Sequence, residues 1–531
     1  MADLTRVRDA KSDKGMATSA NPLASQAGID IMKKGGNAID AAAAVSLALG
    51  VVAPAFSGMG GGGLMLVHIA KTGENHVIDY RETAPGLATA SMYRTRSDGE
   101  VEGDENFYGV KAPGVPGNPA GLALALKKFG RLSLADVARP AVSLARNGFP
   151  VSHLMGAIFQ ENQDNYQRKF KAFPEGGKNL LKPDGTPYKK GETIVWKDYA
   201  NTIDRVSKNG TAEFYEGFVA DSLDKFMTAN GGPMRKTDLL NYKPFMRKPL
   251  VGTFRDLQIV TLCPPSSGGI ALIQLLKLFE SLDLKKTGHN TSETIERMSK
   301  ALGPVYKARD LVADPDFETV DSAKLTSAAF IKGLQGQAYG VEGARRDGSH
   351  TTHVSVMDAE GNIVSLTESL ECFFGSGVVV PGTGMFLNDT MHDFDSVPGH
   401  LNSVAPGKRP KSSMTPTIFF KNGKPVLVVG SAAGPRIITA VLQVALNVFE
   451  HGMEVQDAIN APRFHFQGGK NIRMENRIPQ DIQNELKRRG YGIELHPDYD
   501  LEFGGVQAIL VKDGIMHGGA DPRRDGGAVG L

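Results

Sequence analysis

Two adjacent threonines in the segment DGSHTTHVSVMD, residues 347–358, stand where a threonine hydroxyl could act as a nucleophile. The polar run that ends at His350 gives way to an alternating pattern, which predicts a strand beginning at Thr351. Threonine is common in strands, and that is an ordinary reason for its presence. A hydroxyl nucleophile also needs a base, and a threonine at a chain end carries one in its own α-amine. Thr351 is therefore a catalytic candidate only if the chain is cut between His350 and Thr351.

Such a cut is chemically reasonable as a reaction of the chain on itself. The Thr351 hydroxyl can attack the carbonyl carbon of His350, which converts the peptide bond into an ester that water then hydrolyses. Gly348 and Ser349 permit the bent backbone that this step needs. The freed α-amine has an unperturbed pKa of about 7.7–8.0, so a useful fraction of it is neutral at physiological pH.

The residues after Thr351 predict a β-hairpin that brings a second hydroxyl to it. TTHVSVMD and NIVSLTESL both alternate, and the AEG between them is typical of a turn. If Asp358 pairs with Asn362, Thr351 lies opposite Ser369, within reach across the two strands. A two-residue loop would shift this register.

A second candidate element is the strand, turn and helix predicted over residues 424–452. Its turn, around Ala432 to Gly434, leaves backbone N–H groups free at a helix N-terminus, where an oxyanion can bind. An ordinary connection made of small residues explains the same pattern. Further upstream, helices are predicted over residues 22–34 and 38–49, with Asn37 as a cap and Gly50 as the end of the second.

The run SGMGGGGLMLVHIA, residues 57–70, predicts a tight turn where backbone packs on backbone, followed by a strand. It lacks the Gly-Lys-Ser/Thr of a phosphate loop. The strand HVIDY ends at Arg81 and Glu82, residues 114–242 are mainly helical in pattern, and residues 252–282 predict a strand, a turn and an amphipathic helix. Residues 310–350 have the loosest pattern.

Composition and missing motifs exclude several classes of protein. Lys plus Arg number 60 and Asp plus Glu 58, so the charge does not favour nucleic acid or an anionic membrane as partner. His350 and His353 would point to opposite faces of a strand, and no H-E-x-x-H, paired C-x-x-C, G-x-S-x-G or dinucleotide motif is present. We therefore expect no metal and no cofactor, and a small-molecule substrate.

The N-terminus, the longest apolar run and the cysteines also bear on the class of protein. The N-terminus has charges without an apolar stretch, and the longest apolar run, residues 41–56, is too short to span a bilayer. We expect a cytoplasmic location for the chain as it stands. Cys263 and Cys372 are too few for a disulfide scaffold and are expected to be buried hydrophobes.

Many segments together resemble one family. TTHVSVMDAEGNIVSLTESL resembles the start of the small subunit of the γ-glutamyltransferase (γ-glutamyltranspeptidase, glutathione hydrolase) family of N-terminal-threonine hydrolases. The other segments that resemble it, in family order, are MATSANPLASQAG, GGNAIDAAAAVSLALGVV, SGMGGGG, YRETAP, PPSSGG, GMFLNDTMHDF, KRPKSSMTPTI, GSAAGPRIITAVLQ, NAPRFH and DPRRDGGAVG.

This resemblance implies an α+β fold, the N-terminal-nucleophile hydrolase αββα four-layer sandwich with two antiparallel sheets covered by helices. It also implies a zymogen that cuts itself. Residues 1–350 would form the large subunit and residues 351–531 the small one, interlocked as a single domain and a heterodimer. Higher assembly is left open.

The resemblance also implies roles for the candidates above. Thr351 matches the nucleophile, and Ser369 stands where the family usually has a supporting threonine. Ala433 and Gly434 stand where a Gly-Gly pair usually supplies the oxyanion hole. Because that hole uses backbone N–H groups, alanine is expected to be tolerated if its φ stays negative.

Other matching residues would hold the acyl group of the substrate. Arg81 matches the arginine that binds the substrate's α-carboxylate, and Ser412 with Ser413 matches a serine pair that assists it. Asp393 matches the aspartate that binds the α-amino group.

Three departures affect the same pocket. Glu371 replaces a usual asparagine, Thr390 replaces a usual Gln or Glu, and the segment of residues 393–410 is shorter than the family's lid. We expect a rearranged α-amino site, formed by Glu371 and Asp393, in a more open pocket. The expected substrate is a γ-glutamyl amide such as glutathione or glutamine. A glutaryl-type acylase, a small oxo-acid amidase and an uncut, non-catalytic binding protein are the alternatives.

Overall fold

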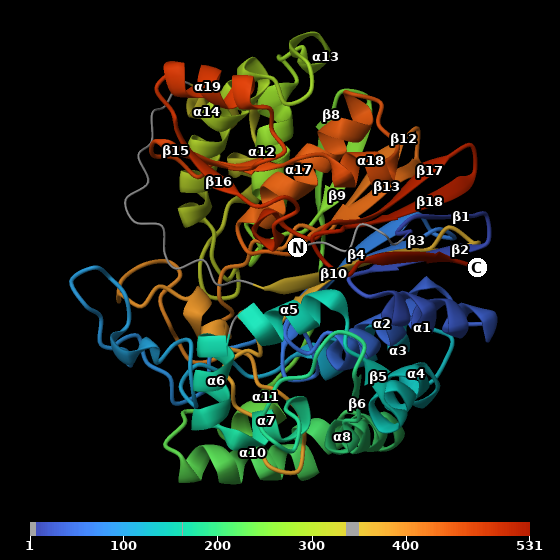
Figure 1. Cartoon of the computed structure of the whole chain (residues 1–531), viewed down its shortest axis with the longest axis vertical. Coiled ribbons are helices and arrows are strands. Elements are labelled where there is room, and N and C mark those ends of the chain that lie inside the picture. Colours follow the sequence, from blue (N-terminus) through green and yellow to red (C-terminus); the bar gives the residue numbers. More distant parts are fainter. Residues whose placement is uncertain (1–6, 162, 336–349) are drawn as a thin grey trace.

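The computed structural model describes residues 7–161, 163–335 and 350–531, and these form four layers in the order helix, sheet, sheet, helix (Figure 1). Each sheet has seven strands, and all neighbouring strands within the two sheets are antiparallel. The predicted four-layer sandwich is confirmed.

The first sheet has, in spatial order, the strands β1 (Ala10–Ser12), β18 (Ile515–Ala520), β17 (Gln507–Lys512), β13 (Lys424–Gly430), β12 (Thr417–Lys421), β9 (Leu257–Thr261) and β8 (Leu250–Phe254). The second sheet has the strands β19 (Gly527–Gly530), β2 (Gly15–Ser19), β10 (Thr351–Asp358), β11 (Ile363–Ser369), β3 (Gly62–Ile69), β4 (Glu74–Tyr80) and β7 (Phe245–Arg247). Two small sheets lie outside them, β14 (Phe464–His465) with β15 (Asn471–Glu475) and β16 (Gly492–His496), and β5 (Phe149–Pro150) with β6 (Thr193–Ile194).

Helices cover the outer face of each sheet. Beside the first sheet, at the top of Figure 1, are α12 (Gly268–Phe279), α13 (Leu284–Thr287), α14 (Ser292–Ala308), α15 (Ser322–Leu325), α16 (Ala328–Leu334), α17 (Arg436–Phe449), α18 (Val455–Asn460) and α19 (Gln480–Arg488). Beside the second are α1 (Pro22–Lys33), α2 (Ala38–Val52), α3 (Asn118–Phe129), α4 (Leu134–Asn147), α5 (His153–Glu161), α6 (Gln163–Ala172), α7 (Pro174–Leu180), α8 (Lys197–Asn209), α9 (Ala212–Tyr215), α10 (Phe218–Ala229) and α11 (Lys236–Asn241). The short 3₁₀ helices are η1 (Glu102–Asp104), η2 (Arg309–Leu311), η3 (Thr390–Asp393) and η4 (Leu501–Phe503).

Three apolar layers hold the four structural layers together. One cluster joins the second sheet to its helices, another joins the first sheet to α12, α14 and α17, and a third lies between the two sheets. Leu66 on β3 and Val428 on β13 belong to the layer between the sheets, and both are fully buried. Burial on both faces explains why these strands have nearly continuous apolar sequences rather than strict alternation.

The helices predicted near the N-terminus are confirmed, with one correction. Asn37 caps α2 by accepting hydrogen bonds from the N–H groups of Ile39 and Asp40, as predicted. Gly50 does not end this helix, which continues to Val52. A side chain at Gly50 would come within 2.9 Å of the Tyr199 hydroxyl, so glycine serves close packing there instead of termination.

The helix predicted behind the PPSSGG turn is also present, but it is buried nearly all round instead of amphipathic, because α12 packs between the first sheet and α14. Of the segment predicted to be loosest, residues 310–335 hold only the short helices α15 and α16 and part of η2. The rest of that segment, to residue 349, lies outside the described residues.

Strands from both sides of the predicted cut are interleaved in the second sheet. β10 pairs with β2 and β11, and β11 pairs in turn with β3. The strands β2, β3, β4 and β7 precede residue 350, whereas β10, β11 and β19 follow it. The backbone hydrogen bonds of this sheet therefore connect the two parts of the chain at several places.

The glycine run packs backbone on backbone, as predicted. A Cβ at Gly60 would lie 1.9 Å from the carbonyl oxygen of Phe386, and one at Gly61 would lie 2.1 Å from that of Ser369. No side chain fits at either distance. The glycine run thereby brings β3 against the end of β11, directly beside Ser369, which carries the second hydroxyl of the predicted site.

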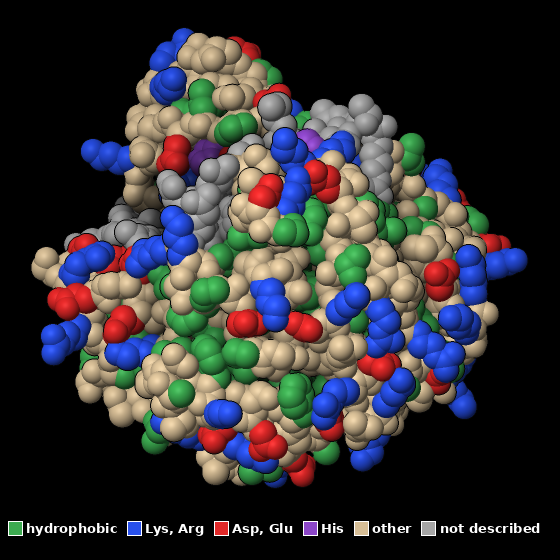
Figure 2. All heavy atoms as spheres, turned by 60° about the horizontal axis from the view of Figure 1, so that its bottom comes forward, with side chains coloured by type: hydrophobic (Ala, Val, Ile, Leu, Met, Phe, Trp, Pro, Cys, Tyr) green, Lys and Arg blue, Asp and Glu red, His purple; other side chains and the backbone are tan. Residues whose placement is uncertain are grey.

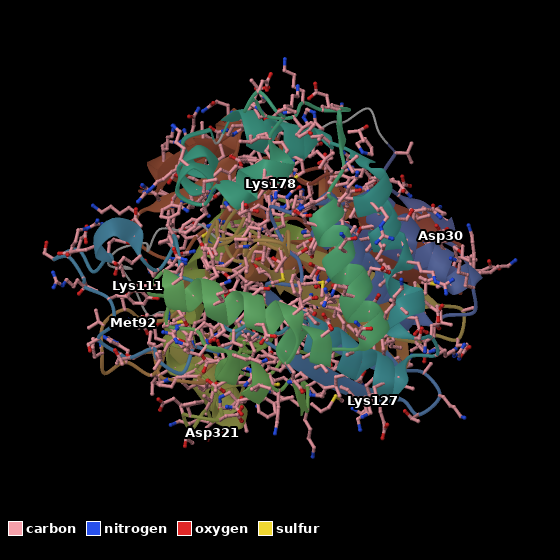
Figure 3. All side chains as sticks on the ribbon, turned by 90° about the horizontal axis from the view of Figure 1, so that it is seen from below. Asp30, Met92, Lys111, Lys127, Lys178 and Asp321 are labelled. Carbon is pink, nitrogen blue, oxygen red and sulfur yellow. The ribbon has the colours of Figure 1, made fainter. Side chains whose placement is uncertain are left out.

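The surface mixes charges of both signs. Figure 2 shows Lys and Arg interspersed with Asp and Glu over one face, and charged side chains such as Asp30 and Lys127 lie at the rim in Figure 3. Both cysteines are buried and free, as expected. Within the described ranges, we find no helix with the length and apolar character that a membrane span requires.

Glu368 on β11 is a buried acid whose titration should affect stability. It is 1% exposed and accepts hydrogen bonds from the Ser46 hydroxyl at 2.6 Å and the Asn118 amide at 2.8 Å. Burial raises its pKa from 4.5 to about 7. The folded protein therefore keeps a proton that the unfolded chain loses, and stability falls as the pH rises from about 4.5 through 7.

We predict that Glu368→Gln removes the loss of stability that the wild type shows as the pH rises. Relative to the wild type, the variant should melt at a higher temperature at pH 8.5, with a stability gain of at most about 3 kcal/mol. The gain should shrink to nothing near pH 4.5, where both proteins are uncharged at this position. Melting curves by calorimetry between pH 4.5 and 8.5 measure the difference, and a difference that does not change with pH contradicts the role given to Glu368.

Candidate active site

The structure places the candidate nucleophile opposite its predicted partner. Thr351 is the first residue of β10, is 2% exposed and pairs with Ser369 at the end of β11. Their hydroxyl oxygens lie 3.3 Å apart. The predicted register is confirmed, because the hairpin turn after Asp358 has the length that the sequence pattern indicates.

The peptide bond before Thr351 lies at the same hydroxyl. Ser369 Oγ is 3.5 Å from the carbonyl oxygen of His350, at the limit of a hydrogen bond. The backbone N–H of His350 donates to the carbonyl oxygen of Glu371, and its imidazole stacks on the Phe373 ring with centroids 3.5 Å apart. Sequence reasoning missed Phe373, because an aromatic residue inside a loop carries no signal of its partner.

The predicted oxyanion turn lies over the start of β10. Gly430, at the end of β13, packs against the His353 ring, where a Cβ would come within 2.1 Å of the ring. The turn then leads to Arg436, the first residue of α17, whose N–H donates to the Ala433 carbonyl oxygen at 3.1 Å. The elements therefore bring this turn and Thr351 to the same end of the two sheets.

The condition under which alanine was expected to be tolerated, a negative φ at Ala433, is not met. Ala433 has φ = +89° and Gly434 has φ = +51°, so two successive residues are left-handed. The chain needs this conformation to turn from the end of β13 into α17 within a few residues. An alanine in this region is strained by its Cβ, whereas glycine is not.

Arg81 lies within a group of three carboxylates. It follows β4, is 1% exposed, and its guanidinium contacts Asp393. The same guanidinium is 3.4 Å from Glu82 and 3.9 Å from Glu371. The structure thus brings together the residues expected to bind the substrate's carboxylate and its ammonium, and adds Glu82, which sequence reasoning left without a role.

One guanidinium cannot neutralise three carboxylates, and the pKa values of two of these acids are raised. Burial and the neighbouring Asp393 raise the pKa of Glu371 well above its ordinary value. Burial also raises the pKa of Glu82, despite the opposing effect of Arg81. Thr390, the other departure from the family pattern, lies beside Glu82. The site therefore has an excess of negative charge that either a proton or a bound cation can offset.

His392 completes a group with the spacing of metal ligands. Among the described residues, ligand atoms of Glu371, His392 and Asp393 lie within 4.8 Å of one another. The Arg81 guanidinium already contacts Asp393 and lies near Glu371, so a fixed cation competes with any metal ion at these two carboxylates. The arrangement fits an ammonium group of a substrate better than a metal.

The predicted serine pair is held by a second turn. Ser412 forms a bridge with Ser266 of the PPSSGG turn, and the N–H of Ser267 donates to the Ser412 carbonyl oxygen at 2.8 Å. The Ser413 hydroxyl accepts a hydrogen bond from Arg309, which also donates to Ser267 at 2.9 Å. Arg309 was not found from the sequence because its segment has no recognisable pattern.

The segment after Asp393 folds back onto it. The Asn402 side chain donates to the Asp393 carbonyl oxygen at 2.7 Å and accepts from the Lys411 N–H at 2.8 Å. Arg81 and Glu371 are buried, whereas the Asp393 side chain is 22% exposed. Solvent therefore reaches this pocket beside Asp393.

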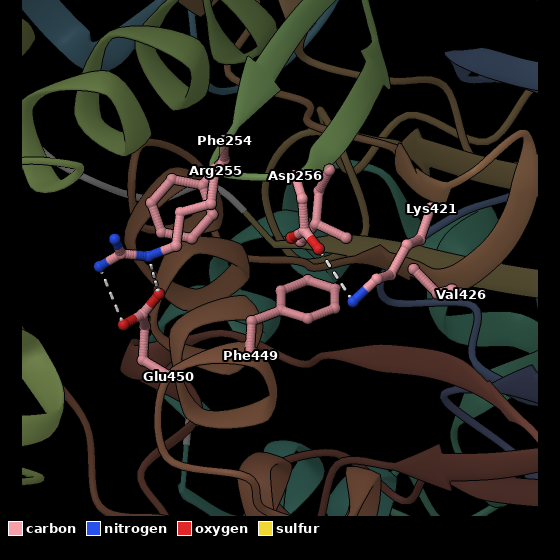
Figure 4. Close-up of a pocket in the computed structure, with 8 residues that line it drawn as sticks. Phe254, Arg255, Asp256, Lys421, Val426, Phe449 and Glu450 are labelled. Atoms are coloured by element: carbon pink, nitrogen blue, oxygen red, sulfur yellow. Dashed lines mark hydrogen bonds and ion pairs between the residues drawn. The ribbon is translucent and has the colours of Figure 1, made fainter.

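A separate surface pocket lies at the far ends of the first sheet and α17 (Figure 4). Two ion pairs border it, Arg255 with Glu450 and Asp256 with Lys421, and Phe449 lies between them. Its cationic and anionic groups already pair with each other, and none of the candidate catalytic residues lines it.

Comparison with known proteins identifies the family. The model of the family described as gamma-glutamyltranspeptidase matches residues 24–531. The chain belongs to this family of enzymes. It is 37% identical to the glutathione hydrolase proenzyme of Bacillus subtilis (strain 168), over 97% of this chain and 91% of that protein. It is 36% identical to the acylase ACY 1 proenzyme of Pseudomonas sp. (strain SE83), over 100% of this chain and 96% of that protein.

Solved structures agree with the fold of a gamma-glutamyltranspeptidase family member. A cephalosporin acylase from Bacillus halodurans superposes with a TM-score of 0.88 at 29% identity, over 99% of this chain and 97% of that one. The gamma-glutamyltranspeptidase of Helicobacter pylori gives a TM-score of 0.56 at 37% identity, over 59% of this chain and 88% of that one. The similar proteins are thus named partly as γ-glutamyl or glutathione enzymes and partly as acylases.

We predict that the chain of this family member is cut between His350 and Thr351 and that Thr351→Ala prevents the cut. Alanine lacks the hydroxyl that must attack the His350 carbonyl, so the variant should remain a single band of full length and have no activity. Denaturing gels and mass spectrometry of the purified protein show the products, and Thr352→Ala serves as the matched control. Cleavage at this bond in Thr351→Ala would remove Thr351 from the mechanism.

We predict that Ala433→Gly raises stability. Glycine relieves the strain of a positive φ, which should increase the free energy of unfolding by about 1 kcal/mol and keep the turn intact. Ala433→Val adds a β-branched side chain in the same conformation and should lower both stability and kcat. Calorimetry and steady-state kinetics on the pair check this, and equal melting temperatures for all three proteins would contradict it.

Proposed function

We propose that this protein is a γ-glutamyl amide hydrolase and transferase that matures by cutting itself between His350 and Thr351. The observation that supports the substrate most directly is the group of three carboxylates around the single guanidinium of Arg81. The observation that supports the maturation is the position of Ser369, which is close to both the Thr351 hydroxyl and the His350 carbonyl.

Maturation begins with the Thr351 hydroxyl. Its oxygen attacks the carbonyl carbon of His350, the C–N bond breaks, and the nitrogen takes up the proton to become the α-amine of Thr351. Water then hydrolyses the resulting ester and leaves a carboxylate on His350. Ser369 assists by donating a hydrogen bond toward the His350 carbonyl oxygen, which becomes negative as the bond forms.

The cut gives Thr351 the base that it lacked. The neutral α-amine accepts the hydroxyl proton as Thr351 attacks the carbonyl carbon of a substrate amide. The N–H groups of Ala433 and Gly434 stabilise the oxyanion, the amine leaves with a proton, and an ester on Thr351 remains. Water or a second amine takes the acyl group from it. The two pieces stay together as a heterodimer, because strands from both form the second sheet.

The charges in the acyl pocket favour a zwitterionic head group over an anionic one. Arg81 supplies one positive charge, whereas Glu82, Glu371 and Asp393 supply three acids. A γ-glutamyl group carries both a carboxylate and an ammonium, so it adds no net charge. A glutaryl group carries the carboxylate alone, and it would bring a further negative charge to buried acids that already resist ionisation.

Binding of the zwitterion exchanges one internal ion pair for two intermolecular ones. In the absence of substrate, Arg81 contacts Asp393 directly. The substrate carboxylate binds the Arg81 guanidinium in a bidentate ion pair, and the substrate ammonium binds Asp393 and Glu371. The ammonium also lowers the pKa of Glu371, because its positive charge favours the ionised carboxylate.

The second candidate is an acylase with a different acyl specificity. It is favoured by the likeness to the cephalosporin acylase structure, with its TM-score of 0.88, and by the 36% identity to the acylase ACY 1 proenzyme. The replacement of the usual asparagine by Glu371 is the chain's own departure at the acyl site, and its effect on acyl preference decides between the two candidates.

We predict that the wild type prefers γ-glutamyl-4-nitroanilide to glutaryl-4-nitroanilide in kcat/KM by at least about tenfold, as one lost charge-assisted contact implies. Glu371→Gln should reduce this preference by lowering kcat/KM for the γ-glutamyl substrate. The control is Glu360→Gln, because Glu360 is exposed and pairs with Arg131. A wild-type preference for the glutaryl compound would favour the acylase, and an unchanged preference in Glu371→Gln would remove Glu371 from the ammonium site.

A further inference from the structure

Arg524, in the loop between β18 and β19, is a buried cation without a hydrogen-bonded anion. Its residue is 2% exposed, and none of its three side-chain nitrogens has a hydrogen-bond partner among the described residues. Gly505 packs against its aliphatic part, where a Cβ would lie 2.4 Å from Cγ of Arg524. A buried guanidinium normally has its donors satisfied by carboxylates or carbonyls, so this side chain indicates a ligand that supplies them.

The three acids whose charges act on Arg524 already have other partners, and one of them, Asp500, is 3.1 Å from His496. Asp521 is 2.8 Å from Arg463 and 3.1 Å from Arg523. Glu502 is 3.3 Å from Arg436 and 3.2 Å from Arg473. Burial lowers the pKa of Arg524 to about 10 even with these acids nearby. An additional anion is therefore needed to offset its charge fully.

The second sheet places Arg524 at the same end as the nucleophile. Gly527 of β19 pairs with Ser19 of β2, and Ser19 also pairs with Val354 of β10. Because β19 and β10 both run antiparallel to β2, they run parallel to each other. Arg524 lies in the turn of residues 522–525 that leads into β19, and Thr351 is the first residue of β10. Both residues therefore lie at the same end of the second sheet.

Aromatic contacts extend from Arg524 to the peptide bond that is cut. Its guanidinium lies 5.0 Å from the Phe56 ring, which meets the Phe373 ring edge-on at 5.5 Å. Phe373 stacks in turn on the His350 imidazole. In the uncut chain, two aromatic rings thus connect Arg524 to His350.

The charges near His350 differ from those in the acyl pocket. Burial, and after it the charges of Arg524, Arg436 and Lys169, lower the pKa of the His350 imidazole. The charged groups that act on Glu371 are Asp393, Arg81 and Asp389. The surroundings of Glu371 are therefore acidic around one arginine, whereas those of His350 are basic.

We propose that Arg524, with Arg436 beside it, binds a carboxylate on the amine that leaves from the substrate, in the space that His350 vacates after the cut. The ligand class is a peptide or amino-acid amide whose leaving amine ends in a carboxylate, and the same site would hold an acceptor of that kind. This inference rests on the proposed function for the position of the scissile amide, but not for the identity of the acyl group.

The test uses two acyl groups and two leaving groups. The substrates are γ-glutamyl-alanylglycine and its C-terminal amide, and the glutaryl derivatives of both peptides. In the wild type, kcat/KM for the acid should exceed that for the amide by roughly tenfold to a hundredfold, the range of a charge-assisted hydrogen bond. In Arg524→Gln the ratio should fall to about 1, and in Arg524→Lys it should be intermediate.

Controls separate binding from folding. Arg473→Gln removes another arginine that contacts Glu502, and it should keep the wild-type ratio. Arg524→Gln should be cut normally and should melt no lower than the wild type, because it removes an unpaired buried charge. A fall in its melting temperature with an unchanged ratio would assign Arg524 a structural role and overturn the proposal.

The outcomes also separate this proposal from the proposed function. If only the glutaryl peptides are cleaved, the γ-glutamyl assignment fails, while their acid-to-amide ratio still tests Arg524. If no peptide is cleaved, thermal shifts of the cut protein with alanylglycine and with alanylglycinamide measure the site directly. An acid-to-amide ratio of 1 or less in the wild type, or equal thermal shifts with the two dipeptides, would overturn the proposal.

Discussion

The register of one hairpin in the middle of a sheet is the constraint on which the rest of the site depends. Thr351 and Ser369 face each other because β10 and β11 pair without a bulge from the turn to their far ends. Both strands have neighbours on each side, so a slip by one residue would break hydrogen bonds with β2 and β3 and turn the hydroxyls to the other face. The glycines that lead into β3 hold the end of β11 by backbone contact.

Around this fixed pair, charge is distributed unevenly. Arg81 is outnumbered by acids in the acyl pocket, whereas the buried guanidinium of Arg524 has no hydrogen-bonded anion among the described residues. Neither imbalance is relieved inside the protein, because burial makes unpaired charge costly and the acids respond by raised pKa values. A substrate with an ammonium at one end and a carboxylate at each end would relieve both. The free energy that these unpaired charges cost the protein without substrate would then contribute to the affinity for the substrate and to its orientation.

Local pattern was enough for some elements and insufficient for others. Alternation and the AEG turn predicted the hairpin and its register, and Asn37 predicted the start of α2, because both depend on nearby residues. Gly50 was wrongly predicted to end the helix. A glycine stands there because a side chain would collide with Tyr199, which is distant in sequence. The sequence left the sign of φ at Ala433 open, because the path between β13 and α17 sets it.

By itself, the sequence determined the fold, the family and the position of the candidate nucleophile, since strand alternation and family motifs are written in contiguous residues. Only the tertiary structure decided which charges meet. Arg81 with Asp393, His350 with Phe373, and Arg524 at the same end of the sheet as Thr351 join residues that are distant in sequence or that a whole hairpin separates. Electrostatic and stacking energies depend on distance in space and on burial, and neither quantity exists until the sheets have packed.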